Sequence, residues 1–337
     1  MVNRFFIDLA DGSDPVPFEP PDPGPPLRLD TVYFSRMLAE VQRRAPVDGL
    51  TYYLTWSSTR LPRVGDDVVA VVLSDEASRR PAYTDEVRAV FKTYGGRPRR
   101  TRPLRPTRLD AVVALQEARR IAEAAPEQAS VAARRLLGRA PRPVHPIPLG
   151  YWNQVEVDVP PIEQRGVDVS FAGSVEEPRH GASLTGGLLE SPKVVSRRQM
   201  LAELERYERD RPQRTLDVKT IPAFGTVGRE DATDYSTRLA NTKVCLVPRG
   251  GSVETYRWFE AMRVGCVVIG EPMPPFWFYK GSPAVEVSDW RDLPAILDRL
   301  LTDPAELARR STASVDWWNR RLSEEAVGAF VAGRLGR

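Results

Sequence analysis

The sequence predicts an α/β protein made of two units, each with its own parallel sheet. The run Asp67–Leu73 (DVVAVVL) is apolar on both faces, which is typical of strands in a parallel sheet that is covered on both sides. Residues 241–270 read as strand, turn, short helix and strand, which is a βαβ unit. A chain of 337 residues is also long enough for two domains with separate cores.

The first half contains the elements of one such unit. We expect a strand at residues 4–9, and then a helix from an N-cap at Asp30 to about Arg44, with Val32, Leu38 and Val41 on one apolar face. The prolines of residues 15–27 exclude a regular helix or a central strand there. The other expected elements are strands at 50–55, 67–73 and 89–93, one or two helices within 108–138, and an extended segment at 141–153.

A polar, proline-containing connector near residues 155–167 marks the predicted domain boundary. We therefore expect an N-terminal domain over residues 1–160, a second domain over 161–310, and a closing helix at 311–337 that packs back toward the first domain. The second domain is expected to hold a strand at 168–172, a helix at 196–209, a strand at 215–219, a helix near 235–241, the βαβ unit, a strand at 284–287 and a helix at 292–301.

Composition narrows the class of protein. Hydrophobic residues make up 42% and charged residues 28% of the chain, as in soluble globular proteins, and no apolar run approaches the roughly 20 residues of a membrane span. The N-terminus has acids where a signal peptide has a basic and an apolar region, so we expect a cytoplasmic protein. Only five of the 48 basic residues are lysines and 31 residues are prolines, which suggests a GC-rich bacterial genome.

The two cysteines and the two histidines show no spacing typical of a metal site. Cys245 and Cys266 both fall inside expected strands, where a cysteine acts as a small apolar residue. Residues 95–145 carry twelve Arg against four acidic residues, a local charge of +8. This segment is either a solvated Arg/Pro loop followed by a helix, or a surface for an anionic partner. Since no aromatic residues interleave with the arginines, we do not expect nucleic-acid binding.

Three motifs in the second half resemble a known family. They are CLVPRGG from Cys245, Arg257-Trp-Phe-Glu260-Ala, and Gly265-Cys-Val-Val-Ile. Together they resemble the C-terminal signature of exostosin-type glycosyltransferases, family 47 and its bacterial relatives. DVSFAGS at 168–174 is similar to the strand that opens the donor domain of that family. The resemblance extends over roughly residues 165–305 and is faint in the first half.

The resemblance implies a GT-B fold, with two Rossmann-like domains facing a cleft, a C-terminal closing helix and a nucleotide sugar bound by the second domain. It also implies an inverting, metal-independent glycosyltransferase that moves a sugar to a hydroxyl acceptor. The nucleotide sugar is a co-substrate, no other cofactor is expected, and the acceptor is a glycan, a lipid-linked glycan or a small molecule. A non-catalytic nucleotide- or carbohydrate-binding module of transferase descent is the alternative.

A diphosphate leaving group requires backbone N–H groups, helix N-termini or arginines to stabilise its charge. Candidate donor-binding residues lie after the strand at 168–172, at the start of the helix near 196, and in the βαβ unit, whose helix we expect to begin near Gly250. They are Gly173, Ser174, Arg197, Arg198, Arg249, Gly250, Gly251, Ser252, Arg257 and Glu260. In the resemblance, Glu260 matches an acid that holds hydroxyls of the ribose or sugar; the alternative is a surface ion pair with Arg257.

An inverting transfer also needs a general base for the acceptor hydroxyl. Asp75 and Glu76 are the leading candidates, because they follow the strongest strand of the first half, although they could instead cap the next helix. His145 is the second choice, and Asp11 and Glu19 remain open. The aromatic loop PPFWFYKG at 274–281 could stack on a base or sugar, or pack between the domains.

Overall fold

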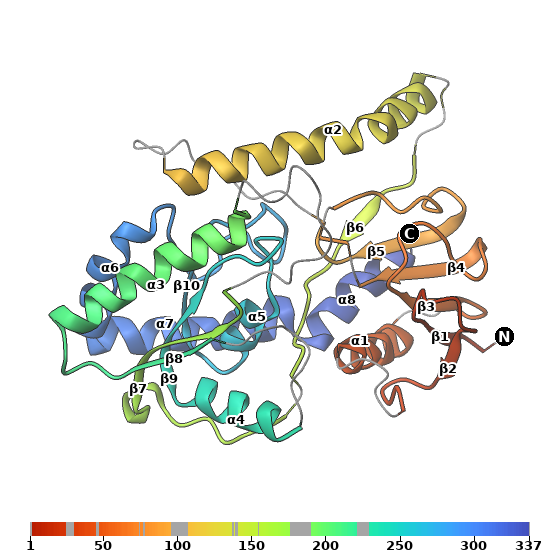
Figure 1. Cartoon of the computed structure of the whole chain (residues 1–337). Helices are drawn as coiled ribbons and strands as arrows, with labels where there is room; N and C mark the ends of the chain where they lie inside the picture. Colours follow the sequence, from red (N-terminus) through yellow and green to blue (C-terminus); the bar gives the residue numbers. More distant parts are fainter. Residues whose placement is uncertain are drawn as a thin grey trace.

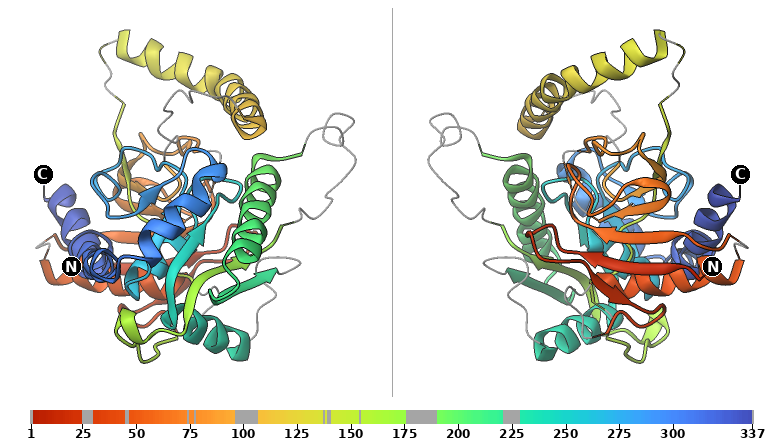
Figure 2. Two further views of the ribbon diagram at one scale, coloured as in Figure 1. Left: turned by 90° about the vertical axis from the view of Figure 1, so that its left-hand side faces the viewer. Right: turned by 90° about the vertical axis from the view of Figure 1, so that its right-hand side faces the viewer.

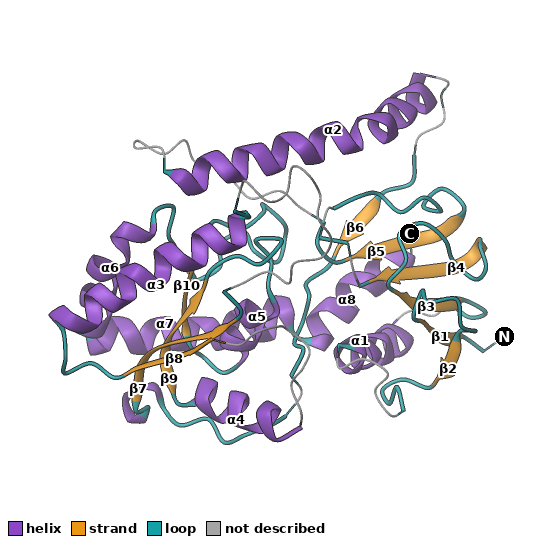
Figure 3. Ribbon diagram, viewed as in Figure 1, coloured by secondary structure: helices purple, strands orange, loops and turns teal. Residues whose placement is uncertain are grey.

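The α/β class is confirmed by a computed structural model of the chain, which contains two separate sheets with helices packed around them (Figures 1 and 3). The structure describes residues 2–336, apart from 25–29, 45–46, 74, 77, 96–106, 137, 139–140, 154, 176–189 and 221–228. Residues 97–106 of the Arg/Pro loop therefore lie outside the described residues.

The first sheet has the strand order β2-β1-β3-β4-β5-β6, in which only the pair of β1 and β2 is antiparallel. Its strands are β1 (Arg4–Asp8), β2 (Val16–Phe18), β3 (Thr51–Thr55), β4 (Gly65–Val72), β5 (Val87–Lys92) and β6 (Val144–Pro146). Val68, Val69 and Val71 in β4 are fully buried, as the apolar run predicted. Helix α1 (Thr31–Arg44) connects β2 to β3, and α2 (Arg108–Leu136) lies between β5 and β6 in the chain.

The second sheet is fully parallel, in the order β11-β10-β9-β7-β8. Its strands are β7 (Val167–Gly173), β8 (Leu216–Thr220), β9 (Thr242–Val247), β10 (Val267–Gly270) and β11 (Val285–Glu286). The strand order reverses between β7 and β9. In doubly wound sheets of this kind, ligands bind beyond the carboxyl ends of the strands at that reversal point.

The helices of the second half are α3 (Pro192–Asp210), α4 (Arg229–Ala240), α5 (Tyr256–Arg263), α6 (Leu293–Leu301), α7 (Pro304–Trp317) and α8 (Glu324–Leu335). Figure 2 shows α3 and α6 beside the second sheet. In the described part of the chain, no helix combines the length and the apolarity needed to cross a bilayer.

The two units share one continuous apolar cluster. It joins Leu54 and Val71 of the first sheet to Phe259 of α5 and Val331 of α8. A second cluster lies on the other face of the second sheet and includes Leu204 of α3. Because a close-packed interior has few voids, a shared core fixes how the two units are placed.

The C-terminal helices carry the chain back to the first unit. Helix α7 ends in a π-helical turn, Trp318–Leu322, and α8 then packs on α1. The buried Tyr33 hydroxyl of α1 donates a hydrogen bond of 2.6 Å to the Leu322 carbonyl, at the end of this turn. Two Rossmann-like sheets and a returning C-terminal helix agree with the fold class expected from the sequence.

Three local expectations are corrected. Helix α3 begins at Pro192 with Ser191 as its N-cap, and α5 begins at Tyr256 after an N-cap at Thr255, later than the Gly250 start expected from sequence. The first turns of α2 pack on the second unit, since Leu109 and Val113 join the apolar cluster that contains Leu204. Figure 1 shows α2 lying across both units.

The aromatic loop at 274–281 packs between the units. The Trp277 ring stacks on Phe330 of α8 with ring centroids 4.5 Å apart. Its indole N–H donates a hydrogen bond of 3.1 Å to the Pro146 carbonyl of β6. Of the two alternatives for this loop, packing between domains is therefore the one that the structure shows for Trp277.

The contact of α8 with α1 makes a specific prediction. A Cβ at Gly328 would lie 2.5 Å from the Glu40 Cβ and 2.9 Å from the Met37 carbonyl oxygen, so Gly328→Ala should lower the free energy of unfolding by about 1–3 kcal/mol. Gly333 lies in the same helix with nothing within 4 Å of the same position, and Gly333→Ala should raise it by about 0.5–1 kcal/mol. Urea unfolding of both variants measures the difference; equal effects would contradict the packing.

Candidate functional site

The candidate site lies where the strand order of the second sheet reverses. Strand β7 ends at Gly173 and leads to Ser174, and β9 leads into residues 248–255, here named the glycine loop. The Gly250 N–H donates a 2.8 Å hydrogen bond to the Ser252 carbonyl, which closes the loop. Val253 and Glu254 are both buried, so the chain turns into the core before α5 begins. This is why Gly250, Gly251 and Ser252 precede the helix instead of forming its first turn.

Two arginines converge on Gly173. A Cβ at this position would lie 3.0 Å from Nη2 of Arg257 and 3.4 Å from Nη1 of Arg197. Both guanidinium groups also lie over the Phe171 ring, 5.2 Å and 6.0 Å from its centroid. A side chain at 173 would therefore press against both guanidinium groups at the end of β7.

Among the described residues, no ion pair joins either arginine of this pair to a carboxylate, although the charges of Glu271 and Glu76 act on Arg197. Arg197 donates from Nε to the Arg249 carbonyl at 3.0 Å and from Nη1 to the Ser174 carbonyl. The buried Nε of Arg257 has no hydrogen-bond partner among the described residues. Burial, and then the charge of Arg257, lowers the pKa of Arg197 well below its ordinary value. Two cations held together in this way favour an anion between them.

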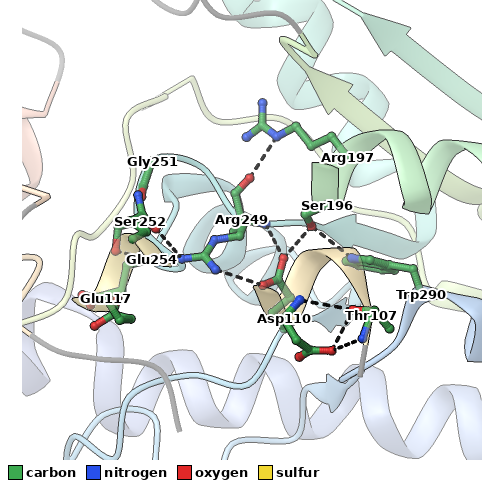
Figure 4. Close-up of polar contacts among 12 residues, drawn as sticks. Thr107, Asp110, Glu117, Ser196, Arg197, Arg249, Gly251, Ser252, Glu254 and Trp290 are labelled. Carbon is green, nitrogen blue, oxygen red and sulfur yellow. Dashed lines mark hydrogen bonds and ion pairs between the residues drawn. The ribbon is translucent and has the colours of Figure 1, made fainter. Parts of the chain in front are cut away.

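Arg249 has a different position, inside the protein (Figure 4). Its side chain is 1% exposed and lies 3.7 Å from Glu271. Oε1 of Glu271 also accepts hydrogen bonds from the Arg249 amide, at 3.2 Å, and from the Ser196 hydroxyl, at 2.5 Å. Arg249 therefore ties the glycine loop to the end of β10 and to α3. Arg198, one residue beyond Arg197, is exposed and pairs with Glu190 instead of joining the arginine pair.

Glu260 is buried and bound to protein groups. Oε1 accepts hydrogen bonds from the backbone N–H groups of Trp152, at 3.0 Å, and Asn153, at 2.9 Å, and Oε2 accepts one from the Tyr235 hydroxyl at 2.8 Å. The alternative of a surface ion pair with Arg257 is therefore wrong. Since a carboxylate has about four acceptor sites, one remains for a ligand, and binding of a ribose or sugar hydroxyl stays a prediction.

The structure separates the two candidate bases, Asp75 and Glu76. Asp75 has a left-handed backbone (φ 74°), and its side chain turns inward. It accepts a 2.8 Å hydrogen bond from the Arg79 N–H and lies 3.7 Å from the buried ammonium group of Lys92. In the described residues between β4 and β5 there is no helix, so the interpretation of these acids as helix caps is wrong.

Glu76 turns the other way, toward the glycine loop. A Cβ on Gly251 would lie 1.9 Å from its Oε2, and the Ser252 N–H faces its carboxylate. Burial of the carboxyl group raises the pKa of Glu76, and the nearby charges of Arg120, Lys193 and Arg197 oppose the rise. The structure therefore brings Glu76, but not Asp75, to the candidate donor site.

The other candidate bases lie in different surroundings. His145 packs between the rings of Phe91 and Phe330, at 5.3 Å and 6.5 Å, and burial lowers its pKa. Asp11 accepts a 2.6 Å hydrogen bond from the Ser13 hydroxyl in an exposed loop, and Glu19 makes a backbone bridge with Asp22. Within the described residues, no group of three or more His, Cys, Asp or Glu side chains is arranged to hold a metal ion.

Sequence reasoning missed two residues of α2 that touch the glycine loop. Arg120 Nη2 and Gln116 Nε2 both donate to the Gly251 carbonyl, at 3.1 Å and 3.4 Å. A spacing of four residues places both on one helix face. That spacing alone did not indicate which unit the face would contact.

The sequence matches no protein-family model and no curated protein. Among solved structures, it is similar to a chain of the GtfA/B complex at 14% identity and a TM-score of 0.42, over 90% of this chain and 60% of that one. It is also similar to sucrose-phosphate synthase from Thermosynechococcus elongatus (12%, TM-score 0.41, 98% and 87% covered). A third similar structure is AviGT4, a glycosyltransferase involved in avilamycin A biosynthesis (13%, TM-score 0.39, 99% and 96% covered).

At these identities and TM-scores the similarities assign neither a family nor an activity. The chain spans less than two thirds of the GtfA/B-complex chain that it matches. The resemblance to exostosin-type transferases stays a prediction, and the interpretation of the site rests on its own geometry.

The arginine pair predicts binding of pyrophosphate. Because a ligand that binds only the native state stabilises it, millimolar pyrophosphate should raise the melting temperature of the wild-type protein. Arg257→Ala should abolish this shift, because it removes the cation that lies against Gly173. Arg209→Ala, at an exposed position of α3, is the control and should keep the shift. An equal shift in Arg257→Ala and the wild type would contradict the anion site.

Proposed function

We propose that this protein is a glycosyltransferase that moves a sugar from a nucleotide-sugar donor to a hydroxyl acceptor, with inversion and without a metal ion. The observation that carries the proposal is the pair Arg197 and Arg257, which form no ion pair among the described residues and converge at the reversal point of a doubly wound sheet. An anionic ligand with two phosphates fits this arrangement, because arginine forms bidentate hydrogen bonds to phosphate oxygens.

The same residues can support departure of the nucleoside diphosphate. When the bond from the anomeric carbon to the diphosphate oxygen breaks, negative charge develops on that oxygen. Arg197 and Arg257 are held at the end of β7 before the ligand arrives, so they stabilise this charge without rearrangement.

Glu76 is the proposed general base. In an inverting transfer, the base removes the proton of the acceptor hydroxyl while its oxygen attacks the anomeric carbon on the face opposite the leaving group. Glu76 comes from the first unit and meets the donor site at Gly251, which is the side from which an acceptor must approach. Its raised pKa makes the carboxylate a better proton acceptor than an ordinary glutamate.

Replacement of Glu76 tests this role. Glu76→Gln keeps the shape but removes the base, so kcat should fall by about 10²- to 10⁴-fold while the affinity for nucleoside diphosphate stays close to that of the wild type. In the wild type, kcat/KM should fall as the pH drops through the raised pKa of Glu76, because protonation removes the base. Both the fall in kcat and the pH dependence of kcat/KM are measured by the release of nucleoside diphosphate from UDP-, GDP- and dTDP-sugars in the presence of candidate acceptors.

Glu86→Gln, at an exposed position before β5, is the control for this substitution and should leave the rate unchanged. Full activity of Glu76→Gln would exclude Glu76 as the base. Binding of nucleotides without turnover of any sugar would instead support the non-catalytic binding module.

Glu260 makes a separate prediction, because its protein contacts and a ribose contact have different consequences. Glu260→Gln weakens the hydrogen bonds from Trp152, Asn153 and Tyr235, so the free energy of unfolding should fall by about 1–3 kcal/mol. If Glu260 also binds ribose, calorimetry should show weaker binding of UDP but unchanged binding of pyrophosphate. Equal losses for both ligands would instead indicate a general disturbance of the site.

A further inference from the structure

The peptide unit between Gly251 and Ser252 lies between two different parts of the protein. Its carbonyl accepts hydrogen bonds from Arg120 and Gln116 of α2, at 3.1 Å and 3.4 Å. Its N–H faces the Glu76 carboxylate of the first unit and lowers the pKa of that group. The C=O and N–H of a planar trans peptide point in opposite directions. A group that holds the carbonyl therefore also sets the direction of the N–H.

Helix α2 is anchored so that it can hold this carbonyl. Its start is closed by a capping box, in which Thr107 Oγ1 accepts from the Asp110 N–H at 3.2 Å and Asp110 accepts from the Thr107 N–H at 2.7 Å (Figure 4). Leu109 and Val113 then bury one face of the helix in the apolar cluster of the second unit. Arg120 lies three turns beyond Leu109 on the same face.

The side chain of Arg120 is itself held in place. It is 15% exposed, and its Nη1 lies 3.4 Å from Oε1 of Glu117, one turn earlier in α2. Nη2 is left to donate to Gly251. A charged donor forms a stronger hydrogen bond with a carbonyl than the neutral amide of Gln116 does, so Arg120 is the dominant constraint on the peptide.

We propose that Arg120 is a positioning residue of the donor site, which holds the Gly251–Ser252 peptide so that its N–H points at the anionic group of the ligand. This inference rests on the proposed function. Without ligand, that N–H faces the Glu76 carboxylate; with ligand, it donates to a phosphate oxygen. Arg120 thus acts through the backbone and touches neither substrate nor the reacting atoms.

The charges around Glu76 give this role a second signature. The groups that face its carboxylate are Arg120 from α2, Lys193 and Arg197 from α3, and the Ser252 N–H from the glycine loop. Among the charges, Arg120 lowers the pKa of Glu76 most. Loss of Arg120 should therefore move the acid limb of the pH profile of kcat/KM to higher pH, which loss of a merely structural residue would not do.

The chain offers a matched control in the neighbouring residue. Arg119 is 80% exposed and donates a 2.9 Å hydrogen bond to Glu123 on the solvent side of the same helix. Arg119→Ala removes the same charge from the same turn of α2 but leaves the peptide held. The test compares Arg120→Ala, Arg120→Lys and Arg119→Ala with the wild type.

Three measurements are made on the full chain: pyrophosphate affinity by calorimetry, amide hydrogen exchange in residues 248–255, and the pH profile of kcat/KM. Arg120→Ala should weaken pyrophosphate binding by about tenfold, because one oriented donor is lost, and should speed exchange in the glycine loop. Arg120→Lys should restore part of both, and Arg119→Ala should match the wild type.

The positioning role would be overturned if Arg120→Ala and Arg119→Ala showed the same amide exchange in the glycine loop and the same pyrophosphate affinity. A lower melting temperature in Arg120→Ala, with unchanged exchange and affinity, would do the same. The exchange measurement needs no turnover, so it tests the positioning role even if no sugar is transferred. If the wild type binds no pyrophosphate, both the proposed function and the ligand-binding part of this inference are wrong.

Discussion

The absence of a side chain at Gly251 is the constraint on which the candidate site depends. A Cβ there would lie 1.9 Å from the Glu76 carboxylate, so the contact between the two units at this point requires glycine. Gly251 is not among the described glycines with a positive φ. Glycine is therefore required at this position because a side chain would not fit, and not because the backbone needs a left-handed conformation. Through this one contact, a carboxylate of the first unit reaches a loop of the second.

The shared apolar core makes such a contact precise. Because Phe259 of α5 and Val331 of α8 belong to the same cluster as Leu54 and Val71, the two sheets cannot slide past each other without opening voids. Lys92 adds a buried polar element at the same junction. Its ammonium group donates hydrogen bonds to the carbonyls of Thr93 and Asp75, at 3.0 Å and 3.3 Å, and so fixes the turn that carries Glu76.

Much of the fold could be predicted because its signals are local. The buried strand β4 and the βαβ unit show their apolar pattern within ten to thirty residues of sequence, and both lie where that pattern indicated. Helix starts were less predictable. Helix α5 begins at Tyr256 because Val253 and Glu254 are drawn into the core, a tertiary effect that no local signal indicated.

The candidate site also combines features that the sequence indicated with features that only the tertiary structure decided. The sequence by itself indicated the acids after β4, the end of β7 and the arginines of two helices, so Glu76, Gly173, Arg197 and Arg257 were all among the candidates. The tertiary structure decided between neighbours: Arg197 turns to the end of β7 while Arg198 faces solvent, and Glu76 meets Gly251 while Asp75 turns inward to Lys92. The physical reason is that adjacent side chains point in different directions, and only packing determines which direction leads to the site. Packing also brought Arg120 of α2 to the glycine loop, across 131 positions of the chain, a contact for which the sequence carries no signal.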